Sequence, residues 1–248
     1  MESATFISQK NEIMKKIFFL LMAFVFIKAQ AQTVDEIIQK HANAMGGLDN
    51  FKQIKTAKFT GTVSVQGNDL PIIIQVINGK AMRTDVDAMG QKVTNAYKDG
   101  KGWMINPFAG ASTATDVTGD MLDEFKNQSY IIPALIDYKA RGYKVQLMGQ
   151  ENVDSTKAYK IQLTNDKNKT DTYYIDANTY MLIKFVGTRN MMGQDMELET
   201  YFGDVKDEGN VKLAMSRSIK TGGQTIQEIH FDKVDLNAPI DEKIFDKP

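Results

Sequence analysis

Cysteine is missing from this chain altogether, and histidine and tryptophan nearly so, with two and one in 248 residues. Without cysteine the chain has no disulfide bond. It also lacks the lipid-modified cysteine that a bacterial lipoprotein carries at its mature N-terminus. If the chain is exported, we therefore expect a soluble product rather than a lipid-anchored one.

The small number of histidines leaves little room for an enzyme or a metal site. His41 and His230 lie far apart in the sequence, and neither has a second ligand at metal spacing. Gly110-Ala111-Ser112 lacks the following glycine of a nucleophile elbow. The stretch Asp166–Asp171 lacks the glycine and the bidentate glutamate of a calcium loop. We therefore expect no catalytic residue, no metal and no cofactor.

Long apolar runs are absent near the N-terminus as well. The run Ile17–Ile27 has eleven residues, whereas a membrane-spanning helix needs about 20. Lys15 and Lys16 precede this run, and the small-residue site Ala29-Gln30-Ala31 follows it. This order is typical of a cleavable secretory signal peptide, so we predict that the chain is exported.

The same pattern predicts how the chain is organised. We expect a signal peptide at residues 1–31, in which residues 1–13 are an upstream extension, and a single domain at residues 32–248. No linker or internal repeat divides that domain. The net charge of the whole chain is −1, which gives no electrostatic footprint for nucleic acid or for an anionic membrane surface.

Helical spacing of apolar residues occurs in two regions. Thr33 to Glu36 has the T-x-x-E pattern of a capping box, and the helix that it begins is expected to end at Gly46-Gly47. A short turn at Leu48–Ile54 follows. A second helical stretch is expected between about Gly119 and Ala140.

Most of the remaining chain alternates with a period of two, the pattern of strands with one buried face. Phe59–Val65 and Leu70–Ile77 are expected to form a hairpin. Asp99-Gly100 supplies the positive φ angles of another tight turn. Later strands include Tyr159–Thr164 and Met196–Phe202.

These elements predict an α+β fold dominated by antiparallel sheet: an incomplete, strongly curved β-barrel of about 10–11 strands. The segment Pro107–Thr118 is small and polar, and we expect it to be irregular. The N-terminal helix and a helical lid are expected to cover the mouth of the barrel. The inner face of the sheet would then enclose an apolar cavity.

One segment carries a family resemblance. Between Gly79 and Pro107 the chain has Arg83, then the turn Asp99-Gly100-Lys101, then Trp103, and finally the step Asn106-Pro107. This order resembles LolA, the family of outer-membrane lipoprotein-sorting proteins. In that family a strand with a buried arginine is followed by a D-G-K turn, a tryptophan and an Asn-Pro step.

Looser matches extend the resemblance over most of residues 33–248. Later parts of the family's sheet are similar to three segments of this chain, Tyr173–Asp176, Tyr201–Val205 and Ile244-Phe245. Residues 107–140, in contrast, do not match the family's lid. The resemblance implies a soluble periplasmic carrier that binds the acyl chains of lipoproteins in an apolar cavity. Such a carrier moves them from the inner towards the outer membrane.

The resemblance also implies partners. These are acylated lipoproteins or lipids, an inner-membrane ABC release complex that supplies the energy for loading, and an outer-membrane acceptor. The carrier would act as a monomer. The alternative is a paralogue on the same fold that binds another apolar ligand or acts as a periplasmic sensor of envelope stress.

The candidate ligand-binding and lid residues begin with Arg83, which we expect on the inner face. In the family, this arginine donates hydrogen bonds to the backbone of the lid, and these bonds break when cargo enters. The alternative is a salt bridge between Arg83 and Asp85 or Asp87. The other candidates are apolar, and a purely structural role in the core is open for each of them. They are Met89, Trp103, Ile105, Phe108, Phe125, Ile131, Ile132, Leu135, Ile136, Met196, Leu198 and Phe202.

Overall fold

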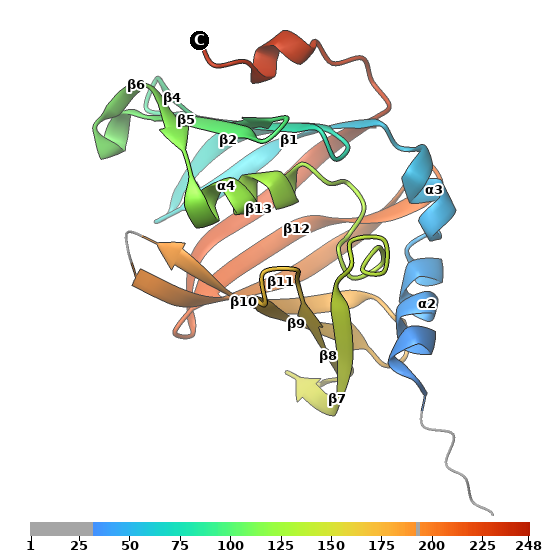
Figure 1. Ribbon diagram of the computed structural model, residues 1–248. Coiled ribbons are helices and arrows are strands. Elements are labelled where there is room, and N and C mark those ends of the chain that lie inside the picture. The colour runs from blue at the N-terminus through green and yellow to red at the C-terminus, as the bar shows by residue number, and fades with distance from the viewer. Residues whose placement is uncertain (1–31, 192–193) are drawn as a thin grey trace, which may run out of the picture. The chain divides into compact units, whose positions relative to one another are not determined.

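The computed structural model describes residues 32–191 and 194–248, so the predicted signal peptide lies outside the described residues. Val34–Pro248 forms one compact unit. It consists of one long antiparallel sheet and a few helical segments (Figure 1). No helix in the described ranges is long and apolar enough to cross a membrane.

The predicted N-terminal helix is confirmed. Helix α2 spans Val34–Ala44 and buries Ile37 and Ile38 on its apolar face. Gly46 and Gly47 have φ angles of 105° and 92°, which glycine adopts without steric cost. They end this helix, and the short helix α3, Leu48–Gln53, follows where a turn is expected.

Thirteen strands form the sheet. Their bounds are β1 Thr56–Val65, β2 Asn68–Ile77, β3 Ala81–Ala88, β4 Gln91–Lys98, β5 Lys101–Asn106, β6 Ala111–Val117, β7 Lys144–Val153, β8 Thr156–Thr164, β9 Thr170–Asp176, β10 Leu182–Met191, β11 Gln194–Glu208, β12 Val211–Thr221 and β13 Gln224–Leu236.

The order of the strands is β6-β5-β4-β3-β2-β1-β13-β12-β11-β10-β9-β8-β7. Every neighbouring pair is consecutive in the sequence except β1 and β13, which join the two halves of the sheet. Strands β6 and β7 remain as free edges, so the sheet does not close. The predicted α+β fold, an incomplete curved barrel, is confirmed, with thirteen strands rather than 10–11.

The extra strands include one in the segment that we expected to be irregular. Pro107–Ala109 forms a single 3₁₀ turn, η2, and Asn106 caps it by accepting hydrogen bonds from the backbone N–H groups of Phe108 and Ala109. Strand β6 then returns along β5, with Val117 opposite Gly102. Most of its side chains are polar and exposed, so backbone pairing rather than an apolar pattern specifies this edge strand.

The second helical stretch is shorter than expected. Helix α4 spans Gly119–Gln128. Residues 131–133 are bent or irregular, and residues 134–142 form turns instead of continuing the helix. Pro133 has no backbone N–H to donate and disfavours helical geometry in the residue before it. Its carbonyl oxygen accepts from the backbone N–H groups of Ile136 and Asp137, at 3.0 and 3.2 Å.

The sheet has two unlike faces, which we call inner and outer. The inner face carries apolar clusters that include Met82 on β3 and contact α4 and the 129–143 segment. The outer face lies opposite. The C-terminal segment, with the 3₁₀ turn η3 at Glu242–Phe245, passes over the other side of β1–β5 from α4 (Figure 1).

Candidate functional site

Helix α4 covers the inner face of β3–β5. Its Phe125 is buried in a cluster with Met82 and Tyr97. Gly102 on β5 permits the close approach, because a Cβ there would lie 2.8 Å from Cδ1 of Leu122. One side of α4 is therefore packed into the apolar core of this half of the sheet.

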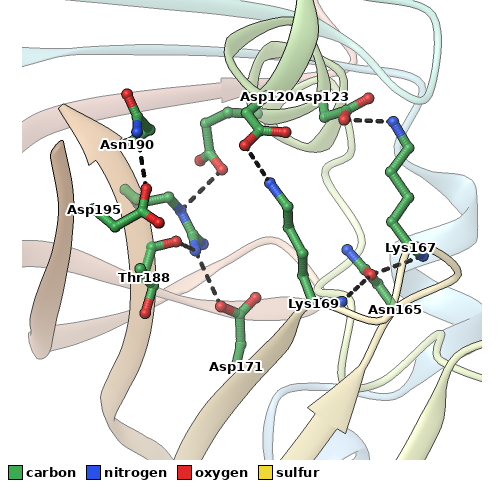
Figure 2. A network of polar contacts seen from close by, with 11 residues as sticks. Asp120, Asp123, Asn165, Lys167, Lys169, Asp171, Thr188, Asn190 and Asp195 are labelled. Carbon is green, nitrogen blue, oxygen red and sulfur yellow. Dashed lines mark hydrogen bonds and ion pairs between the residues drawn. The ribbon is translucent and has the colours of Figure 1, made fainter. Parts of the chain in front are cut away.

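The other side of α4 is acidic and is held by charge. Asp120 lies 2.7 Å from the ammonium group of Lys169, and Asp123 pairs with Lys167. Both lysines belong to the loop between β8 and β9, and Figure 2 shows them reaching the helix. Asn165 shapes this loop, because its side-chain oxygen accepts from the backbone N–H groups of both lysines. We call these contacts, with the Glu124–Arg189 pair described next, the α4 latch.

The third pair of the α4 latch lies deeper. Glu124 is 3.0 Å from Nε of Arg189 on β10, and Asp171 on β9 lies 3.0 Å from Nη1 of the same arginine. Gly187 makes room for the pair, since a Cβ there would lie 2.4 Å from Asp171 Oδ1. Burial raises the pKa of Asp171, and Arg189 opposes that shift. Burial disfavours the charge on Arg189, but Glu124 and Asp171 outweigh it and raise the pKa of the guanidinium.

The apolar residues expected in the lid all occupy the core or its margin. Leu135 is 1% exposed and packs with Ile37 and Ile161. Ile132 and Ile136 pack in a cluster around Phe51, and Ile131 is partly buried against it. The 129–143 segment therefore ties the N-terminal helices to the inner face of the sheet.

Arg83 and Trp103 lie on the outer face, and the expected inner-face position of Arg83 is wrong. Arg83 donates to Asp85 at 2.8 Å and to the carbonyl oxygen of Ile244 at 2.6 Å. The indole N–H of Trp103 donates to the carbonyl oxygen of Phe245 at 2.9 Å. Strand alternation is the reason, because the neighbouring Met82 already occupies the inner face. The salt bridge that we kept as the alternative is present.

Three more candidates also lie away from α4. Met89, in the turn between β3 and β4, is 85% exposed, and Phe108, in η2, is 56% exposed. Ile105 pairs with Thr94, whose hydroxyl donates to Asp85 on the outer face. These residues therefore do not line the inner face.

Met196, Leu198 and Phe202 share the inner face of β11. Phe202 pairs with Arg217 on β12, and the ring of Phe202 lies 5.9 Å from that guanidinium. Arg217 was missed by our sequence analysis. The sequence does contain a signal for this residue. Arg217 alternates with Met215 and Ile219 on one face of β12, so it is a charged residue at a position where apolar side chains are expected.

The outer face carries a groove of about 550 Å³ across β1, β11, β12 and β13. Its lining mixes polar and apolar surface, and it lies on the opposite side of the sheet from the apolar cavity expected from the sequence. The outer-face side chains include Thr62, Ser64, Tyr201, Ser216, Ser218 and His230. On the inner face, α4 covers β3–β5, and the 129–143 segment packs against β8 and β9.

His41 and the acidic residues offer no metal site in the described ranges. His41 is 1% exposed, and its Nδ1 lies 2.7 Å from the carbonyl oxygen of Tyr180. No group of three or more potential ligands is found among the residues that the structure describes.

No family model matches the chain, and no curated protein sequence does. Solved structures match it over most of their length. A DUF1329 family protein from Desulfovibrio piger ATCC 29098 has a TM-score of 0.57 at 12% identity, covering 87% of this chain and 98% of that one.

Two further structures are equally similar. A domain assigned as an outer membrane lipoprotein-sorting protein from Vibrio parahaemolyticus has a TM-score of 0.57 at 13% identity, covering 87% of this chain and 96% of its own. A LolA superfamily protein from Nitrosomonas europaea has a TM-score of 0.57 at 12% identity, covering 88% and 99%. At such low identities the likeness concerns the fold alone. The chain has the LolA-like fold.

Proposed function

We propose that the chain is a periplasmic carrier that binds the acyl chains of lipoproteins against the inner face of its sheet and moves them from the inner towards the outer membrane. One observation carries this proposal. The helix that covers the inner face, α4, is packed by apolar contacts on one side and held on the other side by the ion pairs of the α4 latch. Such a cover can be released on one side without unfolding the core.

The energetics favour this arrangement for a carrier. Each acyl methylene hidden from water stabilises binding by about 0.8 kcal/mol, so a bound chain can replace the contacts that a displaced helix loses. Exposed ion pairs contribute only about 0–1 kcal/mol each. Closure of α4 over the inner face also avoids the display of a large apolar patch when no ligand is bound.

The proposed partners are those of a shuttle. Acylated lipoproteins or lipids are the cargo, an inner-membrane ABC complex loads them, and an outer-membrane acceptor receives them. The carrier would work as a monomer and without catalysis. Phe125 and Leu122 of α4, together with Met196, Leu198 and Phe202 of β11, are the residues that we assign to ligand contact.

Native mass spectrometry of protein taken gently from its own host tests the proposal first. We expect acylated lipoprotein or lipid bound at near-stoichiometric level. A mass without ligand, together with no uptake of a fluorescent fatty-acyl probe, would overturn the carrier proposal. A tightly bound signalling protein in the same spectrum would favour the sensor alternative.

A cross-link tests whether α4 must move. Because the chain has no cysteine, the variant Asp123→Cys/Lys167→Cys offers two unique thiols on either side of the α4 latch. We expect a short bismaleimide that joins them to block probe uptake. The same variant capped at both thiols with N-ethylmaleimide is the control, and it should still take up the probe. Equal uptake in both samples would exclude α4 as the lid.

A further inference from the structure

Arg217 occupies an unusual place on the inner face. It lies on β12 opposite Phe202 of β11 and Ile229 of β13, and Met215 and Ile219 share its side of the strand. Phe231 and Ile229 belong to the apolar cluster of this region. A cation is therefore placed in a register that otherwise holds apolar side chains.

Within the part of the chain that the structure describes, no acidic side chain pairs with the guanidinium of Arg217. Its carbon lies 5.9 Å from the ring centroid of Phe202 and 5.6 Å from that of Phe231. Although the residue as a whole is only half-buried, Nε is shut off from solvent and has no hydrogen-bond partner among the described residues. Burial lowers the pKa of the guanidinium, and no neighbouring charge counters that effect.

This situation is costly for an isolated protein. An arginine side chain stays protonated under all ordinary conditions, and a desolvated charge without a partner destabilises the folded state. The faces of two aromatic rings offset part of that cost. The other inner-face arginine, Arg189, shows the usual solution, because Asp171 and Glu124 neutralise it.

We infer that Arg217 binds the acidic head group, a carboxylate or a phosphate, of an acyl-chain amphiphile whose chain lies along the inner face of β11. Guanidinium matches both anions through two parallel hydrogen bonds, and the apolar surroundings strengthen them. The inner-face side chains of Phe202, Leu198 and Met196 then follow the strand for about 20 Å. This inference rests on the proposed function, because the inner face must first accept an acyl chain.

Displacement of a fluorescent fatty-acyl probe from the purified chain tests the inference. The competitors are oleate, oleyl alcohol and oleyl phosphate, which share one acyl chain and differ in the head group. Wild-type protein should prefer oleate to oleyl alcohol by about tenfold or more, a factor that corresponds to about 1.4 kcal/mol. Arg217→Met should abolish that preference and leave the affinity for oleyl alcohol unchanged, whereas Arg217→Lys should retain part of the preference.

Lys220 supplies the matched control. It lies on the same strand, but its ammonium group stacks over the outer-face ring of Tyr201, so Lys220→Met removes an equal charge from the other side of the sheet. The preference for oleate should survive this change. The ratio of oleate to oleyl phosphate affinity in the wild type shows which of the two head groups the site favours.

The outcomes separate this inference from the proposed function. If neither oleate nor oleyl alcohol displaces the probe because the probe itself does not bind, the proposed function fails. If both bind equally to the wild type, or if Arg217→Met keeps the preference for oleate, the function stands and the role of Arg217 is wrong. A purely structural brace between Phe202 and Phe231 would lower the melting temperature on Arg217→Met without changing the preference.

A measurement without any substitution covers the case of a variant that does not fold. The side-chain ¹⁵Nε resonance of Arg217 in the wild-type protein should shift when oleate is added, and it should not shift with oleyl alcohol. An equal response to both ligands would overturn the inference.

Discussion

His41 is a buried polar side chain, with 1% of its surface exposed. It lies on the buried side of α2 and its ring contacts the carbonyl oxygen of Tyr180. Burial lowers the pKa of His41 to about 4, and the hydrogen bond to Tyr180 opposes that shift. The histidine is therefore neutral in the folded protein at neutral pH.

This burial predicts a loss of stability in mild acid. As the pH falls from about 6.5 towards 4, the unfolded chain takes up a proton at His41 before the folded chain does. The free energy of unfolding should then decrease by on the order of 3 kcal/mol across that window. In urea denaturation at several pH values, His41→Gln should show a flatter dependence on pH. His230→Gln, at an exposed site, is the control; equal slopes for wild type and His41→Gln would contradict the prediction.

Arg83 joins the outer face to the C-terminal segment. Its guanidinium contacts Asp85 and the carbonyl oxygen of Ile244, and the Thr94 hydroxyl donates to the same carboxylate. The side chains of Arg83 and Asp85 are 22% and 13% exposed. Removal of one partner would leave a mostly buried charge unpaired.

Arg83→Leu should therefore reduce stability and leave ligand binding intact. We expect a loss of about 2–4 kcal/mol in the free energy of unfolding, measured by circular dichroism in urea. Arg83→Leu/Asp85→Asn is the control and should recover part of the loss, because the unpaired carboxylate is gone. A change in probe release with no change in stability would restore the lid role that the family resemblance implies.

At the scale of elements, α4 has one side with apolar contacts and one side with ion pairs. The triple variant Asp120→Asn/Asp123→Asn/Glu124→Gln removes the three carboxylate charges of α4 that pair with the β8–β9 loop and with β10. Because exposed pairs contribute about 0–1 kcal/mol each, we expect α4 amides to exchange hydrogen roughly tenfold faster through local opening. Probe uptake should become faster. Added salt screens the ion pairs of the α4 latch in the wild type, so it should speed up uptake by the wild type and not by the triple variant.

The control for the α4 latch is an ion pair that joins neighbouring strands. Asp207 and Lys212 form such a pair at the β11–β12 hairpin, far from α4 in the sequence. Asp207→Asn should leave α4 exchange and probe uptake unchanged. If the triple variant and this control behave alike, the α4 latch does not limit opening.

At the scale of the whole sheet, the pairing of β1 with β13 joins its two halves. Gly61 lies at a register shift in this pair, and a Cβ there would lie 2.0 Å from the carbonyl oxygen of His230 and 2.7 Å from Cα of Phe231. Both neighbours are backbone atoms. They cannot yield without disruption of the pairing.

Gly61→Ala should therefore destabilise the whole unit. We expect a loss of more than about 3 kcal/mol, or failure to fold, in thermal unfolding followed by circular dichroism. Gly203→Ala is the matched control, because its nearest neighbour is the Ser216 hydroxyl at 2.9 Å, a side chain that can rotate. Similar stabilities of the two variants would contradict this account of Gly61.

The predictions from sequence succeeded where the cause is local. The spacing of Ile37, Ile38 and His41 predicts α2, and the turn at Asp99-Gly100 is confirmed by φ angles of 48° and 86°. They failed where partners distant in sequence decide the outcome. Strand β6 is specified by pairing with β5, and the side chain of Arg83 is drawn to Asp85 and to Ile244, which follows 161 residues later.

The sequence by itself determined helix α2, most of the strands and their antiparallel character, because periodicity, glycine conformation and turn chemistry act over a few residues. Only the tertiary structure decided which face of each strand is covered. It placed Arg83 under the C-terminal segment, Arg217 on the inner face and the charges of α4 against the β8–β9 loop. The physical reason is that burial and ion pairing depend on which elements meet in space, and strand alternation alone does not name the inner side.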